Sequence, residues 1–140
     1  MRQSLSEKRT ALLAVVLSVL LAVVAVIDQA GRGSLLDHAA TAYAQHGKQV
    51  SAGSLYGLVY GVAVIDALLW LVVAGLARSR RLIAAIVGVF VVLLTAALGI
   101  TLLVSSEYGV HPFPAIWGVL ALLPAAAGTV AVALLLRRRR

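Results

Sequence analysis

The chain has 140 residues, of which 62% are hydrophobic and only 12% carry a formal charge. A soluble domain is typically about half apolar and about one quarter charged, so the composition excludes a water-soluble globular domain and a disordered chain. The chain contains no cysteine, which excludes disulfide frameworks, thiolate zinc sites, iron–sulfur clusters and thiol redox catalysis. Its length predicts one domain, residues 1–140.

Four long apolar runs account for most of the chain. A transmembrane helix needs about 20 apolar residues to cross about 30 Å of hydrocarbon. Three of the runs have 22 or 23 residues, and the first has 17 with room to extend through Asp28–Ala30. They lack the period-two alternation of barrel strands, so the sequence predicts an all-α polytopic membrane protein, a bundle of four antiparallel transmembrane helices. The predicted spans are Ala11–Ile27, Leu55–Ala77, Leu82–Val104 and Ala115–Leu136.

The basic residues predict the orientation of these spans. Ten of the 12 Lys and Arg residues precede the first span, join the second to the third, or end the chain. Cytoplasmic segments carry an excess of Lys and Arg, which predicts a multi-pass protein of the plasma membrane with both termini cytoplasmic. Because the arginines adjoin span ends, we expect them to contact anionic lipid headgroups and not nucleic acid. The candidate topology and lipid-contacting residues are Arg78, Arg80, Arg81, Arg137, Arg138, Arg139 and Arg140.

The first span also has features of a signal peptide, because a basic segment precedes it. Its 17 apolar residues exceed the usual hydrophobic region of roughly 7 to 15 residues, and no A-x-A cleavage site follows directly. We expect a retained helix, although the sequence alone leaves cleavage open.

The outer segment Asp28–Ser54 has 27 residues and is too long for a bare connector. Leu35–His46 carries an apolar stripe at helical spacing, with Ser34 placed to cap its first turn. We therefore predict a short amphipathic helix that lies on the outer membrane surface or caps the bundle.

The polar residues of the outer segments do not form a recognisable catalytic or metal site. His38 and His46 are eight residues apart, which on a helix is about 12 Å, too far to share one ion. No motif of a metalloprotease, serine nucleophile or phosphate-binding loop is present. We expect no catalytic residue, metal or cofactor, and interpret these side chains as a solvated face.

Asp66 is the one charged residue inside a predicted span, and it lies near the middle of that span. A carboxyl group at that depth is costly and indicates a function by default. Since no span contains Lys, Arg or His, burial favours the protonated, neutral form. The candidate functional or packing residues that share its helix face or its depth are Tyr56, Tyr60, Trp70, Ser18, Thr95 and Pro124.

The sequence is compatible with three roles for Asp66. The first is a neutral acid that hydrogen-bonds to a hydroxyl or carbonyl group of a neighbouring helix and holds the helices together. The second is coupling to a proton or cation. The third is helix pairing across a homodimer, or a lipid-side position that tolerates the acid.

Small residues at four-residue spacing favour close helix contacts in a membrane, where no hydrophobic force drives helices together. Pro124 within the last span leaves the carbonyl of Leu120 without its helical donor, so we expect a kink or another donor there. The candidate contact residues are Gly53, Gly57, Gly61, Ala84, Gly88, Ala121, Ala125 and Gly128.

Several short motifs carry a family resemblance. With Leu55-Tyr56-Gly57, Glu107-Tyr108-Gly109 and Leu122-Leu123-Pro124, the chain resembles small uncharacterised four-span membrane proteins of high-GC actinobacteria. The resemblance implies the four-span fold and no activity. Small multidrug transporters are also four-span proteins of this size, but they carry their essential acid in the first span, whereas Asp66 is in the second.

Two classes of function follow from the sequence. The first is a non-catalytic structural or assembly protein that interacts with lipids or a membrane partner. The second is a small proton- or cation-linked transporter that uses Asp66 and acts as a dimer. The sequence leaves open whether the protein partner is a second copy of the chain or another membrane protein.

Overall fold

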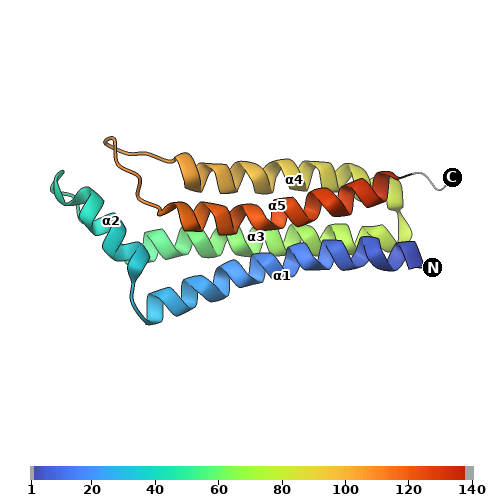
Figure 1. Ribbon diagram of the computed structural model, residues 1–140, viewed down its shortest axis with the longest axis horizontal. Coiled ribbons are helices and arrows are strands. Elements are labelled where there is room, and N and C mark those ends of the chain that lie inside the picture. The colour runs from blue at the N-terminus through green and yellow to red at the C-terminus, as the bar shows by residue number, and fades with distance from the viewer. Residues whose placement is uncertain (1, 138–140) are drawn as a thin grey trace.

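The computed structural model describes residues 2–137, with all of their side chains except those of residues 2–5 and 7. The described residues form five helices and no strand (Figure 1). They are α1 (Arg2–Ala30), α2 (Ser34–Ala44), α3 (Ala52–Ser79), α4 (Arg81–Val104) and α5 (Ala115–Leu136).

The four long helices lie side by side as an antiparallel bundle (Figure 1). Helix α1 packs against α3 and α5, and α4 packs against the same two helices, so each helix has two antiparallel neighbours. All four are long and apolar enough to cross a membrane, which confirms the predicted fold class. The structure is that expected of a multi-pass membrane protein.

The two ends of the bundle differ in chemistry. At one end, the connection Arg80 and both ends of the described chain lie together (Figure 1); we call it the arginine end. At the other end, α2 lies obliquely across the bundle beside the loop of residues 105–114 (Figure 1); we call it the α2 end.

Two predicted boundaries shift in the structure. Helix α1 runs on through Ala30, as the extension of the first run predicted. The connection between α3 and α4, predicted to span four residues, is Arg80 alone, because Arg78 and Ser79 remain helical and Arg81 begins α4. The backbone N–H of Arg80 still donates to the carbonyl of Leu76 at 2.8 Å, which closes the last turn of α3.

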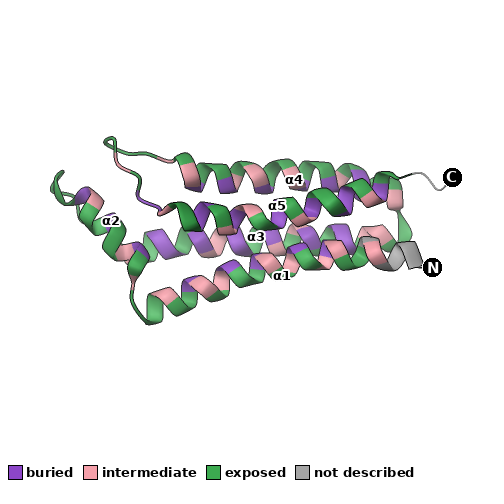
Figure 2. Ribbon diagram, in the orientation of Figure 1, coloured by how far each residue is buried: buried purple, intermediate pink, exposed green. Residues whose placement is uncertain are grey.

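The exterior of the bundle is apolar and its interior contains polar groups. Buried residues follow the facing sides of the long helices (Figure 2), and large side chains such as Leu82 and Phe90 are exposed outside. Inside, Ser18, Asp66 and Thr95 are fully buried. Apolar side chains facing outward along a whole bundle are typical of a lipid-facing surface and unfavourable in water.

Small residues create the closest helix contacts, mainly along α4 and α5. A Cβ atom on Gly128 would lie 2.0 Å from the ring of Trp70, and one on Gly88 would lie 2.7 Å from Val132. These glycines therefore let helices approach more closely than alanine would allow. Gly57 and Gly61 were predicted to make close helix contacts, and this prediction is wrong. Nothing lies within 4 Å of a Cβ placed at either residue.

Candidate functional site

The first candidate site is a group of buried polar side chains halfway along the bundle. Asp66 and Trp70 lie one turn apart on α3, Thr95 lies on α4, and all three are fully buried. The hydroxyl of Thr95 lies near the carboxyl of Asp66 but not in hydrogen-bond geometry. The depth match between Thr95 and Asp66 that the span lengths predicted is therefore present in the structure.

The polar atoms of this group lack hydrogen-bond partners. Within residues 2–137, neither carboxyl oxygen of Asp66, nor Oγ1 of Thr95, nor Nε1 of Trp70 reaches a partner in hydrogen-bond geometry. More than nine in ten buried polar groups in native structures are hydrogen-bonded, and each exception calls for an explanation. A protonated Asp66 would donate to a nearby oxygen, and a cation would bind the oxygens of Asp66 and Thr95. A water molecule would also accept from the N–H of Trp70.

The other residues grouped with Asp66 in the sequence take different places. Ser18 is buried, but its hydroxyl donates to the carbonyl of Ala14 in its own helix at 2.9 Å. Pro124 is buried in α5, which continues as a helix on both sides of it, one turn before the glycine that contacts Trp70. Neither residue supplies a hydrogen bond to Asp66.

Tyr56 and Tyr60 lie far from Asp66, at the α2 end. The hydroxyl of Tyr56 donates to Asp28 at 2.6 Å, and that of Tyr60 donates to Gln29 at 2.7 Å. Tyr56 precedes Asp66 by ten residues, or about 15 Å of helix rise. A shared helix face therefore did not bring these side chains to one site, because their distance along the helix axis separates them.

Asp28 forms a site that the sequence reasoning missed. Its carboxylate accepts the backbone N–H groups of Ser34 and Leu35, each at 3.0 Å, together with the hydroxyl groups of Ser34 and Tyr56. The capping side chain of α2 is thus Asp28 from the end of α1, and not Ser34, because Gly33 with φ of 64° turns the chain back toward Asp28. The sequence feature that indicates this cap is a carboxylate three residues before the turn Gly31-Arg32-Gly33.

Three side-chain contacts join α2 and its following residues to the 105–114 loop. The hydroxyl of Tyr43 donates to Glu107 at 2.6 Å. His46 stacks on Tyr108 with ring centroids 5.3 Å apart, and Nε2 of His38 lies 3.0 Å from the carbonyl of His111. The hydrogen bond to Glu107, assisted by burial, raises the pKa of Tyr43 from its usual 10.0 to about 12. These contacts hold the two segments together over the end of the bundle.

A tight turn presents Tyr108 to this contact. Glu107 and Val110 exchange two backbone hydrogen bonds, of 2.9 and 3.0 Å, and the residues between them have φ of 53° and 77°. This is the pattern of a type I′ turn, in which glycine or asparagine is normal. A tyrosine in the left-handed region costs about 1–2 kcal/mol, which the contacts of its ring to His46 and Lys48 help to offset.

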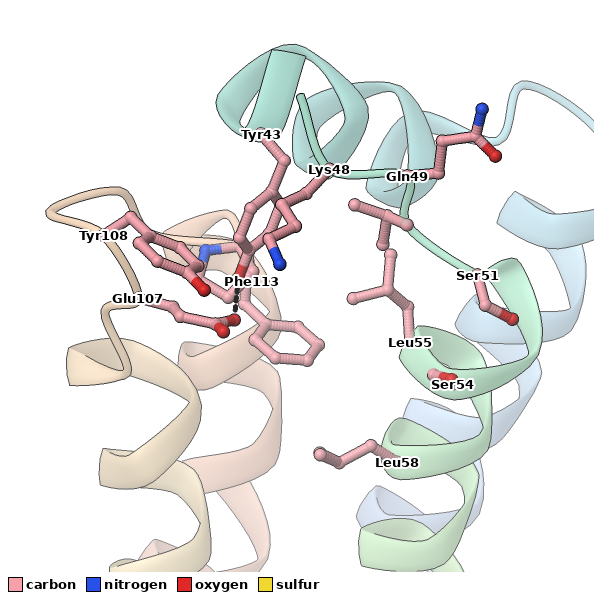
Figure 3. A pocket seen from close by; sticks show the side chains of 12 residues that line it. Tyr43, Lys48, Gln49, Ser51, Ser54, Leu55, Leu58, Glu107, Tyr108 and Phe113 are labelled. Atoms are coloured by element: carbon pink, nitrogen blue, oxygen red, sulfur yellow. Dashed lines mark hydrogen bonds between the residues drawn. The ribbon is translucent and has the colours of Figure 1, made fainter. Parts of the chain in front are cut away.

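A cavity of about 440 Å³ lies beneath these contacts (Figure 3). Its upper part, the roof, is polar, with Lys48 and Glu107 (Figure 3). Its lower part, the floor, is mainly apolar, with Leu55, Leu58 and Phe113 beside the small hydroxyl group of Ser54 (Figure 3). We call it the groove. The residues that line it are Tyr43, Lys48, Gln49, Val50, Ser51, Ser54, Leu55, Leu58, Glu107, Tyr108, Pro112 and Phe113.

At the arginine end, Arg81 joins the start of α4 to the end of α5. Its guanidinium group donates to the carbonyls of Leu135, Leu134 and Arg137 at 3.0, 2.9 and 2.8 Å. A cation at these unpaired carbonyls caps the helix and complements its dipole. The remaining arginines of this end whose side chains are described are exposed, namely Arg9, Arg78, Arg80 and Arg137. Arg138, Arg139 and Arg140 lie outside the described residues.

Among the described residues, no three His, Asp or Glu side chains gather in a way that could hold a metal ion.

The chain was compared with protein-family models, curated proteins and solved structures. None of them matches it.

Proposed function

We propose that the protein is a non-catalytic multi-pass protein of the plasma membrane that binds lipids or a membrane partner at its α2 end. In this proposal both termini are cytoplasmic, the arginine end faces anionic headgroups, and the α2 end lies outside. The observation that carries the binding role is the groove, because a polar roof over an apolar floor matches an amphipathic molecule. The contacts of Tyr43, His38 and His46 hold that roof in place.

Native mass spectrometry of the full-length protein, released from membranes under graded collision energy, tests this role. We expect discrete complexes with lipid, with a second copy or with another membrane protein to survive after the bulk detergent has left. A bare monomer at every energy, from every membrane source, would contradict the proposal.

A proton- or cation-linked role for Asp66 is the second candidate. It is favoured by the unpartnered oxygens of Asp66 and Thr95, which a bound cation or water molecule would satisfy. The N–H of Trp70 needs an acceptor, which a water molecule supplies and a cation does not. In the first candidate the same carboxyl group is a neutral structural acid that never changes its charge. The two candidates therefore differ in whether Asp66 titrates.

Infrared titration of the carbonyl region in liposomes separates the candidates. If Asp66 is coupled to a proton or cation, wild type should show a carboxyl band that changes with pH or cation and is absent from Asp66→Asn. If Asp66 is structural, its protonated band should stay constant, and Asp66→Asn should remain folded within about 1–2 kcal/mol of wild type. Thr95→Val is the matched variant, because it keeps the carboxyl group and removes the neighbouring hydroxyl.

A further inference from the structure

We propose that the groove holds the headgroup and upper acyl chain of one zwitterionic phospholipid of the outer leaflet. The phosphate would lie beside Lys48, the headgroup amine beside Glu107, and the chain along Leu55 and Leu58. This inference rests on the proposed lipid-binding role and orientation, and it names the site and the lipid class.

The depth of the groove favours an acyl chain in its lower part. Leu55 and Leu58 lie in the first two turns of α3, whose residues Ala52–Ser79 form a helix that could cross a membrane. Leu58 is 48% exposed, on the outside of the bundle. An apolar floor at this level borders the hydrocarbon layer, where a lipid chain covers it at lower free-energy cost than water does.

The charges of the roof favour a phospholipid headgroup. Lys48 is exposed, and its ammonium lies 5.8 Å from the ring centroid of Tyr108, which places the cation at the groove. Glu107 adds one carboxylate, whose Oε2 accepts a single hydrogen bond from Tyr43. One cation and one carboxylate over an apolar floor complement a headgroup that carries a phosphate and an amine.

The groove also fits part of a lipid better than a whole protein segment. A volume of about 440 Å³ lies within the usual range of roughly 300–1,000 Å³ for small-ligand pockets. The headgroup and the beginning of one chain would occupy it, and the rest of the lipid would remain in the bilayer beside α3.

Photo-crosslinking tests the proposal with the full chain in nanodiscs. The probe is phosphatidylethanolamine with a diazirine on the acyl chain near the glycerol, and mass spectrometry of peptides locates the adducts. We expect adducts concentrated in residues 48–58 and 107–113. Removing the cation by Lys48→Gln should reduce them about tenfold, whereas Arg32→Gln, which changes an α2-end cation outside the groove, should not.

A second pair of variants tests the apolar floor. Leu58→Trp should fill the groove and remove the adducts. Leu68→Trp should leave them, because Leu68 is also about half exposed on α3, at 58%, but lies outside the groove. Equal helicity of both variants by circular dichroism would show that the loss is not unfolding.

Three outcomes of the lipid photo-crosslinking would overturn the proposal. They are adducts spread evenly over the exterior, adducts insensitive to both Lys48→Gln and Leu58→Trp, and equal labelling by a phosphate-free diacylglycerol probe. A protein cross-linked in the groove of the native membrane, with no lipid adduct, would do the same. If lipids survive in native mass spectrometry while groove adducts are absent, this inference fails and the broader binding role stands.

Discussion

Asp28 connects three helices through one side chain. It belongs to α1, accepts two backbone N–H groups from the first turn of α2, and accepts the hydroxyl of Tyr56 from α3. A carboxylate at a helix N-terminus satisfies donors that have no partner in the helix, and it complements the helix dipole. The position of α2 is therefore determined by a residue of the preceding helix.

Tyr43 offers a pH test of the contact between α2 and the 105–114 loop. Its pKa of about 12 lies above the usual value of 10.0, so its contribution to stability is complete below pH 10 and lost as the pH rises toward 12. We expect the loop contact to open across this interval. The measurement is tyrosinate absorbance, taken as the difference between wild type and Tyr43→Phe.

Glu107→Gln is the matched variant for this titration. The hydrogen bond to Glu107 is the largest cause of the raised pKa, so the variant should bring the pKa of Tyr43 back toward 10. A difference titration that stays near 12 in Glu107→Gln would show that burial alone raises the pKa.

At the scale of elements, α5 packs closely against its neighbours at glycines that leave room for their larger side chains. Gly118 accommodates Leu103 of α4, and Gly128 accommodates Trp70 of α3. Pro124, between these two glycines, is buried without ending the helix. Helices of a membrane bundle depend on such close contacts, because lipid gives them little hydrophobic drive to associate.

Gly128→Ala should destabilise the bundle by about 1–3 kcal/mol, the usual cost of overpacking. The new Cβ would lie 2.0 Å from two ring atoms of Trp70. Gly61→Ala is the matched control and should be neutral, since nothing lies within 4 Å of its Cβ. The measurement is the free energy of unfolding in mixed micelles.

A second substitution identifies the cause of that loss. Adding Trp70→Phe to Gly128→Ala shortens the ring that clashes and should recover part of the lost stability, so the two changes should be non-additive. Equal stability of Gly128→Ala and Gly61→Ala would refute the contact.

The elements were predictable to different degrees, for physical reasons. The four spans follow from uninterrupted apolar runs, and the stripe that includes Leu35, Ala39 and Tyr43 gave α2 to within two residues. The Gly-x-Gly turn after Asp28 indicates a cap, but the partners of the carboxylate depend on how the chain turns at Gly33, which the sequence pattern does not specify. Helix angle places Tyr56 on the same face as Asp66, but it carries no information about the distance along the axis that separates them.

At the scale of the whole molecule, all α2-end segments should lie on one side of the membrane and the arginine end on the other. The chain has no cysteine, so single cysteines report topology directly. With a membrane-impermeant thiol reagent, we expect Ala40→Cys and Ser106→Cys to label from outside intact cells. Ser79→Cys should label only after permeabilisation, and labelling of Ser79→Cys in intact cells would reverse the proposed orientation.

The order of contacts around the bundle has a consequence for biosynthesis. Helix α1 packs against α3 and also against α5, the last of the five described helices to leave the ribosome. The ring of helices therefore closes only when α5 inserts and Gly128 reaches Trp70. Until then the nascent protein has a side open to lipid, beside a carboxyl group at mid-depth. Any membrane chaperone that protects this intermediate would be needed through the synthesis of α5 and released by its arrival.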